Sequence, residues 1–205
     1  MGKVWMYVDG FNFYYAIKHS SYPIGLGWCD FRKLAERHLV GDGNTLERIK
    51  YFTAPVADLG KYGEEYRQDR WLHAVKTIRG LEVIEGFHTE HDTKERTEKQ
   101  TDVNIAVELL RDAARPNGYD VAILVSADID LAPAARAVQL GLPVPKPVHV
   151  WVPLSRPPWR WQELSRTDGV QCHEIKPEML MDSRLDDRTT TSIGPIDCLP
   201  QWRMP

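Results

Sequence analysis

Two observations predict an α/β fold, a three-layer α/β/α sandwich with a central, mainly parallel sheet of about five strands. First, short apolar segments rich in β-forming residues alternate along the chain with segments of helical periodicity. Second, residues 121–125 (VAILV) are apolar at every position, which is typical of a strand covered on both faces. Strands that alternate with helices form parallel sheets between two helical layers.

Five segments carry the strand signal. Residues 4–8 (VWMYV) are short, apolar and rich in β-formers, and residues 48–53 (RIKYFT) and 148–152 (VHVWV) have the same character. The expected strands are 4–8, 48–53, 82–87, 121–125 and 148–152.

Helices are expected in the segments between these strands. The stretch 61–79 has apolar residues at helical spacing and stops before Gly80. The stretch 101–114 is expected to begin with Thr101 as its N-cap, and 88–100 reads as a polar loop. The 101–114 helix should turn Val103, Ala106, Val107 and Leu110 inward. Further helices are expected at 11–19, 31–39 (with Asp30 as N-cap), 131–140 and, briefly, 161–166.

Length and composition fit one domain with a tail. The 205 residues are enough for a substantial core, and 42% hydrophobic and 27% charged residues are ordinary for a globular protein. We expect the domain to cover residues 1–177 and the tail residues 178–205. Because the polar tail ends with Ile196, Leu199 and Trp202, we expect it to pack on the domain.

Composition also bounds the environment and the partners. The sequence has no apolar run of the roughly 18–20 residues that a membrane helix needs, and its first residues do not resemble a signal peptide. Three scattered cysteines predict reduced thiols, no structural zinc and a cytoplasmic location. The net charge of −3 counts mildly against a nucleic-acid binder, although a carboxylate site neutralised by metal is itself acidic.

Acidic residues fall at the ends of the expected strands. Asp9 follows the first strand directly, and Asp128 and Asp130 follow the fourth. Asp102 lies in the first turn of the helix that precedes the fourth strand. Ligands of open parallel sheets bind outside the carboxyl ends of the strands. We therefore expect these four carboxylates to meet at one edge of the sheet.

Clustered carboxylates repel one another unless a cation lies between them. Hard divalent ions such as Mg²⁺ prefer oxygen ligands and also bind phosphate oxygens, so the cluster predicts a metal and phosphate site. Asn12 could hold a water molecule or an acid in place, and Ser126 could donate to a phosphate or a carboxylate. Each residue also has a structural explanation: Asp130 is the best helix cap of the four acids, and Asp102 gains from the helix dipole.

Three motifs, VDGFN (8–12), KQTD (99–102) and SADID (126–130), resemble the acidic motifs of the NYN family, a branch of the PIN-like nuclease superfamily. The resemblance includes the LabA-like group of bacterial NYN proteins and covers residues 3 to about 177. It implies a PIN-like sandwich and Mg²⁺- or Mn²⁺-dependent cleavage of RNA. Asp9, Asp102 and Asp128 would be metal ligands, with Asp130 supporting them and Asn12 positioning Asp9 or a water.

One departure from the family pattern concerns Glu108. Many relatives have an aspartate there, and the longer glutamate keeps the carboxylate, so Glu108 is given a supporting role below the other acids. Ser126 is also given a supporting role, as the hydroxyl donor described above.

RNA is the expected partner, and a homo-oligomer or a protein partner is compatible with the sequence. Lys94, Arg96 and Lys99 could meet phosphates, although the acids interleaved with them equally suggest a solvated loop. Lys18 follows the Asp9 motif together with Tyr14, Tyr15 and His19, which could contact nucleotides, but core packing is the preferred prediction for the tyrosines.

Three other functions remain as alternatives. A phosphohydrolase with an Asp-x-Asp pair after its first strand is disfavoured because position 11 is Phe11. A non-catalytic NYN module that binds RNA or protein is the second, and a DNA nuclease with the same acidic site is the third.

Overall fold

The computed structural model describes residues 1–55, 63–88, 98–99, 101–154, 165–166 and 170–204. Its centre is a six-stranded sheet in the order β3-β2-β1-β6-β7-β8, in which every neighbouring pair is parallel. The strands are β1 Gly2–Asp9, β2 Asn44–Thr53, β3 Leu81–Glu85, β6 Val121–Val125, β7 Val148–Pro153 and β8 Gln171–Ile175.

The α/β fold is therefore confirmed, with one strand more than expected. The additional strand, β8, is at the edge of the sheet and alternates between exposed and half-buried positions until the buried Ile175. Its sequence, QCHEI, has few apolar residues because one side of an edge strand has no neighbour to cover it.

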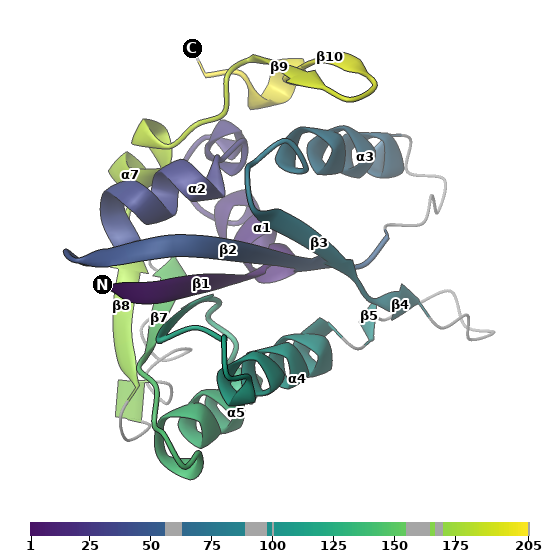
Figure 1. The fold of residues 1–205 in the computed structure, drawn as a ribbon. Helices are drawn as coiled ribbons and strands as arrows, with labels where there is room; N and C mark the ends of the chain where they lie inside the picture. The colour runs from purple at the N-terminus through teal and green to yellow at the C-terminus, as the bar shows by residue number, and fades with distance from the viewer. Residues whose placement is uncertain (56–62, 89–97, 100, 155–164, 167–169, 205) are drawn as a thin grey trace.

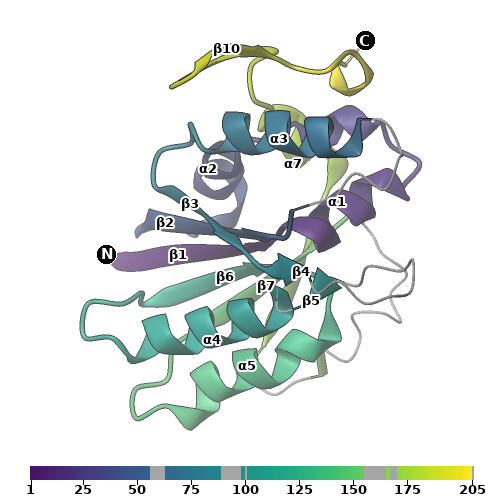
Figure 2. The ribbon, with the colours of Figure 1, turned by 90° about the vertical axis from the view of Figure 1, so that its right-hand side faces the viewer.

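Helices cover both faces of the sheet (Figures 1 and 2). One layer holds α1 Gly10–Lys18, α2 Phe31–Leu34, α3 Glu64–Val75 and α7 Pro177–Asp182, and the other holds α4 Thr101–Ala114 and α5 Ala132–Arg136. α2 continues into a π-turn at Ala35–Leu39, as α5 does at Ala137–Gly141, so helices extend through most of the predicted 31–39 and 131–140.

The core lies in two layers, one on each side of the sheet. Val4, Met6 and Val8 of β1 belong to the cluster under α1, α2 and α3. Trp5 and Tyr7 belong to the cluster against α4 and α5. This alternation follows from the two-residue period of a strand, and it explains why all five residues of the predicted 4–8 strand are apolar.

The prediction for α4 had the correct limits, and Ala106 and Leu110 pack against the core as expected, but the two valines do not. Val103 and Val107 are 61% and 52% exposed, whereas Ile105 and Leu109 are fully buried. Thr101 is the first helical residue and not the N-cap, and its hydroxyl has no hydrogen-bond partner among the described residues.

Two other predicted segments differ from the structure. α3 ends at Val75 and not at residue 79, and the predicted 88–100 loop contains strand residues. β4 Phe87–His88 pairs antiparallel with β5 Glu98–Lys99. Most of the predicted 161–166 helix lies outside the described residues.

The tail forms a hairpin over α3 (Figure 1). β9 Arg188–Thr191 pairs antiparallel with β10 Gly194–Asp197, and a short 3-10 turn follows at Pro200–Trp202. The Trp202 ring lies 5.7 Å from that of Trp28 and 6.5 Å from that of Trp71, and Ile196, Leu199 and Trp202 are all buried.

The domain limit at residue 177 stays a prediction. In the described part of the chain, no helix is long and apolar enough to cross a membrane.

Candidate functional site

The strand order places a topological switch point between β1 and β6. From β1 the chain builds outward through β2 and β3, and then returns to β6 on the other side of β1 before continuing to β7 and β8. The chain segments that leave the carboxyl ends of β1 and β6 therefore run in opposite directions along the sheet. Open α/β sheets bind ligands in the crevice between two such segments. Asp9 is the last residue of β1, and the SADID motif follows β6.

Asp9 is held rigidly at this point. It is only 4% exposed and caps α1, because its Oδ1 accepts a hydrogen bond of 2.9 Å from the backbone N–H of Asn12. Its Oδ2 accepts from the hydroxyl of Ser126 at 2.9 Å. The neighbouring Gly10 is required by space, since a Cβ there would lie 2.6 Å from the Phe52 carbonyl oxygen. Asp9 thus uses Oδ1 to cap α1 and Oδ2 to link the end of β1 to the residue that follows β6.

The SADID motif is linked to the same residues. The backbone N–H of Asp128 donates to the Ser126 hydroxyl at 3.0 Å, and the N–H of Ala127 donates to Oδ1 of Asn12 at 3.1 Å. Asp128 Oδ1 accepts from the N–H of Asp130 at 2.9 Å, so Asp128 caps the turn at Ile129–Leu131. The prediction that Asp130 is the best cap was therefore wrong. Asp130 is exposed.

Asp102 approaches from the first turn of α4, on the other face of the sheet. Partial desolvation, and then the negative charges of Asp128 and Asp130, raise the pKa of Asp102 above its usual value. The structure thus brings Asp102, Asp128 and Asp130 close enough to interact, and no ion pair joins them to a cation among the described residues.

The polar groups of this site suit a hard cation, because its acids, amide and hydroxyl all present oxygen. As the described side chains lie, however, no group of three His, Cys, Asp or Glu residues is arranged to hold a metal ion. Mg²⁺ commonly binds through one or two carboxylates and keeps several waters, so this arrangement is compatible with such an ion.

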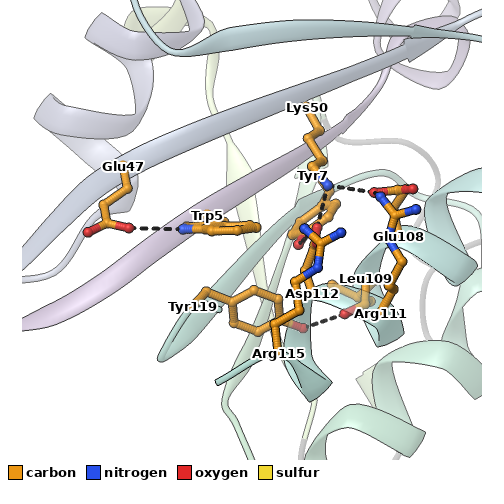
Figure 3. Close-up of polar contacts among 10 residues, drawn as sticks. All are labelled: Trp5, Tyr7, Glu47, Lys50, Glu108, Leu109, Arg111, Asp112, Arg115 and Tyr119. Carbon is orange, nitrogen blue, oxygen red and sulfur yellow. Dashed lines mark hydrogen bonds and ion pairs between the residues drawn. The ribbon is translucent and has the colours of Figure 1, made fainter. Parts of the chain in front are cut away.

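Glu108 belongs to a different cluster (Figure 3). Its Oε2 lies 2.5 Å from Lys50 Nζ and 2.5 Å from a guanidinium nitrogen of Arg111. Lys50 also contacts Asp112, which is fully buried and accepts a 2.9 Å hydrogen bond from the Tyr7 hydroxyl. Burial, then Tyr119 and Asp112, raise the pKa of Tyr7, so its hydroxyl stays protonated and donates. The supporting role of Glu108 at the metal site stays a prediction.

Sequence reasoning missed Lys50 and Asp112. The available signal was Lys50 itself, a charged residue in the middle of a strand whose neighbours Ile49 and Tyr51 are apolar. A lysine at such a position needs buried anions as partners.

Of the predicted RNA-contacting residues, Lys18 is described in full. It is exposed on α1, and its Nζ lies 5.5 Å from the ring centroids of both Tyr14 and Tyr15. Core packing was wrong for Tyr15, which is 39% exposed. Lys94 and Arg96 lie outside the described residues, and of Lys99 only the backbone, in β5, is described.

Comparison with known proteins gives three findings. The NYN domain matches residues 3–144. The 6-hydroxy-3-succinoylpyridine 3-monooxygenase HspA of Pseudomonas putida is 28% identical over 175 residues, which cover 65% of this chain and 54% of that protein. The chain therefore spans about half the length of this curated relative.

A crystal structure of a protein of unknown function from Vibrio parahaemolyticus has the same fold. It superposes with a TM-score of 0.56 at 18% identity, covering 83% of this chain and 92% of that one. Since the NYN match covers well over half of the sequence, the chain belongs to the NYN domain family.

Proposed function

We propose that this protein is an endoribonuclease that depends on Mg²⁺ or Mn²⁺ and hydrolyses RNA phosphodiesters at the carboxyl ends of β1 and β6. The observation that carries the proposal is the convergence of Asp102 with Asp128 and Asp130. Partial burial, and then the charges of these two neighbours, raise the pKa of Asp102. Membership of a nuclease-like family supports the same reading.

In this proposal Asp9, Asp102 and Asp128 surround the metal, one or two of them binding it directly and the rest through its water molecules. A bound divalent ion would supply positive charge for the phosphate and lower the pKa of an attacking water. Ser126 positions Asp9 by donating to Oδ2 and fixes the backbone of Asp128. Asn12 positions the SADID loop through the Ala127 N–H, and the exposed Asp130 adds negative charge beside Asp102.

The test is a cleavage assay with purified protein. End-labelled single-stranded RNA, structured RNA and DNA of the same sequence are incubated with Mg²⁺, Mn²⁺ or EDTA. Asp128→Asn should lower RNA cleavage by roughly 100-fold or more, because a metal ion contributes several kcal/mol to the transition state. Asp42→Asn, which neutralises an exposed aspartate in the loop before β2, is the matched control and should cleave normally.

Each other outcome selects an alternative. RNA binding without cleavage in either metal would favour a non-catalytic module, and preferential cutting of DNA would favour a DNA nuclease. Equal cleavage by wild type and Asp128→Asn would refute the assigned site. Thermal unfolding of Asp128→Asn, measured in parallel, separates loss of function from loss of fold.

A further inference from the structure

A cavity of about 130 Å³ lies between α1, α3 and the Pro200–Trp202 turn of the tail. The aromatic residues that line it include Phe11, Phe13, Tyr14, Tyr51, Trp71 and Trp202. Gly10 also lines the cavity and directly follows Asp9, so the cavity adjoins the candidate site on the α1 side of the sheet.

A second set of rings holds the inner wall of this cavity in place. The Trp71 indole N–H donates to the Tyr51 hydroxyl at 3.0 Å. Behind these two residues, the Phe31 ring lies 5.5 Å from that of Tyr51 and 6.1 Å from that of Trp71, and the Trp28 ring lies 5.6 Å from that of Trp71. All four side chains are buried. Because the wall residues are packed on both sides, the space exists before any ligand enters it.

The size and lining of the cavity suit one small ring. An apolar cavity of about 150 Å³ in another protein stays dry and binds benzene. Aromatic walls offer a ring stacked and edge-to-face contacts in addition to the burial of its apolar surface. A six-membered ring is therefore the unit that this cavity can hold.

The charge at the cavity is positive. Lys18 and Arg67 both line it, and no aspartate or glutamate does so among the described residues. Lys18 is exposed, whereas Phe13 and Ile17 of the same helix are only 2% and 1% exposed. The cation of Lys18 thus lies at the solvent end of the cavity and the apolar wall at the inner end. The Lys18 ammonium is 5.5 Å from the ring centroids of Tyr14 and Tyr15.

We propose that this cavity binds a small aromatic carboxylate, a single six-membered ring that carries its anionic group on a short link. The ring fits the volume and the aromatic wall, and the carboxylate fits the cations at the solvent end. An aromatic amine would meet the same cations with a like charge. The proposal does not depend on RNA cleavage, so it and the proposed function can fail separately.

The test measures ligand binding in EDTA and without RNA. Isothermal titration calorimetry follows benzoate, phenylacetate and 3-phenylpropionate, and the neutral amide of each acid. We expect at least one acid to bind at a single site with a Kd of about 1 mM or lower, and its amide to bind roughly 5-fold more weakly because it lacks the charge. Acetate, which has no ring, should not bind.

Two variants locate the ligand in the cavity. Gly27 lines it, and a Cβ there would have only Ile17 Cδ1 within 4 Å, at 3.8 Å, so the side chain of Gly27→Leu can fill the space. Gly27→Leu should abolish binding, while Gly41→Leu, at an exposed glycine before β2, is the matched control and should bind like wild type. Lys18→Met should weaken binding of the acid roughly 2- to 5-fold and leave binding of the amide unchanged.

Three results would overturn the proposal: no acid that saturates up to about 10 mM, equal affinity for acid and amide, or wild-type binding by Gly27→Leu. Thermal unfolding is measured for every variant, and if Gly27→Leu does not fold, Lys18→Met decides. A wild type that binds no probe, together with a higher melting temperature of Gly27→Leu, would identify the cavity as a packing void.

Discussion

α4 carries two groups of acids that the protein treats in opposite ways. At its first turn, Asp102 faces Asp128 and Asp130, and none of the three forms an ion pair with a cation among the described residues. Ten residues later, Asp112 is fully buried yet contacts Lys50 and Arg115.

The difference separates structural acids from candidate functional ones. Asp112 has no access to solvent, so the fold itself must supply its countercharge, and Lys50 of β2 does so (Figure 3). Asp102 is at the surface beside like charges, so its countercharge can come from solution. The acids at the switch point have no protein cation as partner among the described residues. This lack of a countercharge is better evidence for a metal site than the number of acidic residues is.

The largest expected effect comes from removing the internal countercharge. Lys50→Met leaves Glu108 and Asp112 without their shared cation, and breaking such a buried pair costs about 3–5 kcal/mol. Urea unfolding should show a correspondingly lower midpoint with an unchanged slope. Arg188→Met is the control, because Arg188 and Asp197 form an exposed pair at 3.9 Å whose loss should cost about 1 kcal/mol or less.

A Lys50→Met variant as stable as Arg188→Met would break the comparison, because the half-exposed Arg111 and Arg115 would then be enough to compensate Glu108 and Asp112 without a buried cation.

The contrast also shows what the sequence could predict. Apolar segments and acids directly after them were enough to place Asp9 and Asp128 at adjacent strand ends, because both signals are local in the chain. The strand 4–8 and the limits of α4 were predictable for the same reason.

Tertiary packing decided the features that were missed. The apolar character of Val103 and Val107 led to the prediction that they are buried, but both lie on the solvent face of α4. Ile105 and Leu109 are buried instead, in the cluster that also contains residues of β1 and Tyr119. The Lys50–Asp112 pair joins residues 62 apart, and no spacing rule links them. β8 lacked an apolar run because it is an edge strand.

A smaller effect of opposite sign is expected at the other end of α4. In EDTA, Asp102→Asn removes a charge that Asp128 and Asp130 repel, so it should raise the melting temperature by about 1–2 °C. Mg²⁺ should then raise the melting temperature of wild type more than that of the variant, because a bound ion stabilises the folded state. Asp42→Asn is the control and should respond to Mg²⁺ as wild type does. A variant that melts below wild type in EDTA would show that capping or packing by Asp102 outweighs repulsion.

The smallest effect is the pH dependence of that gain. Burial and like charge raise the pKa of Asp102 in the folded state above its ordinary value of 3.8. At a pH between this ordinary pKa and the raised pKa, the folded protein keeps a proton that the unfolded chain has lost. The contribution of this group to stability therefore falls as pH rises through the interval and is constant above it.

Melting curves in EDTA should show no advantage of Asp102→Asn at the acid end of the interval and its full advantage at pH 7. Since Asp128 is one cause of the raised pKa, the advantage should shrink in an Asp128→Asn background, as coupled sites require. An advantage that is independent of both pH and Asp128 would mean that Asp102 acts only as a helix residue, and it would remove Asp102 from the proposed metal ligands.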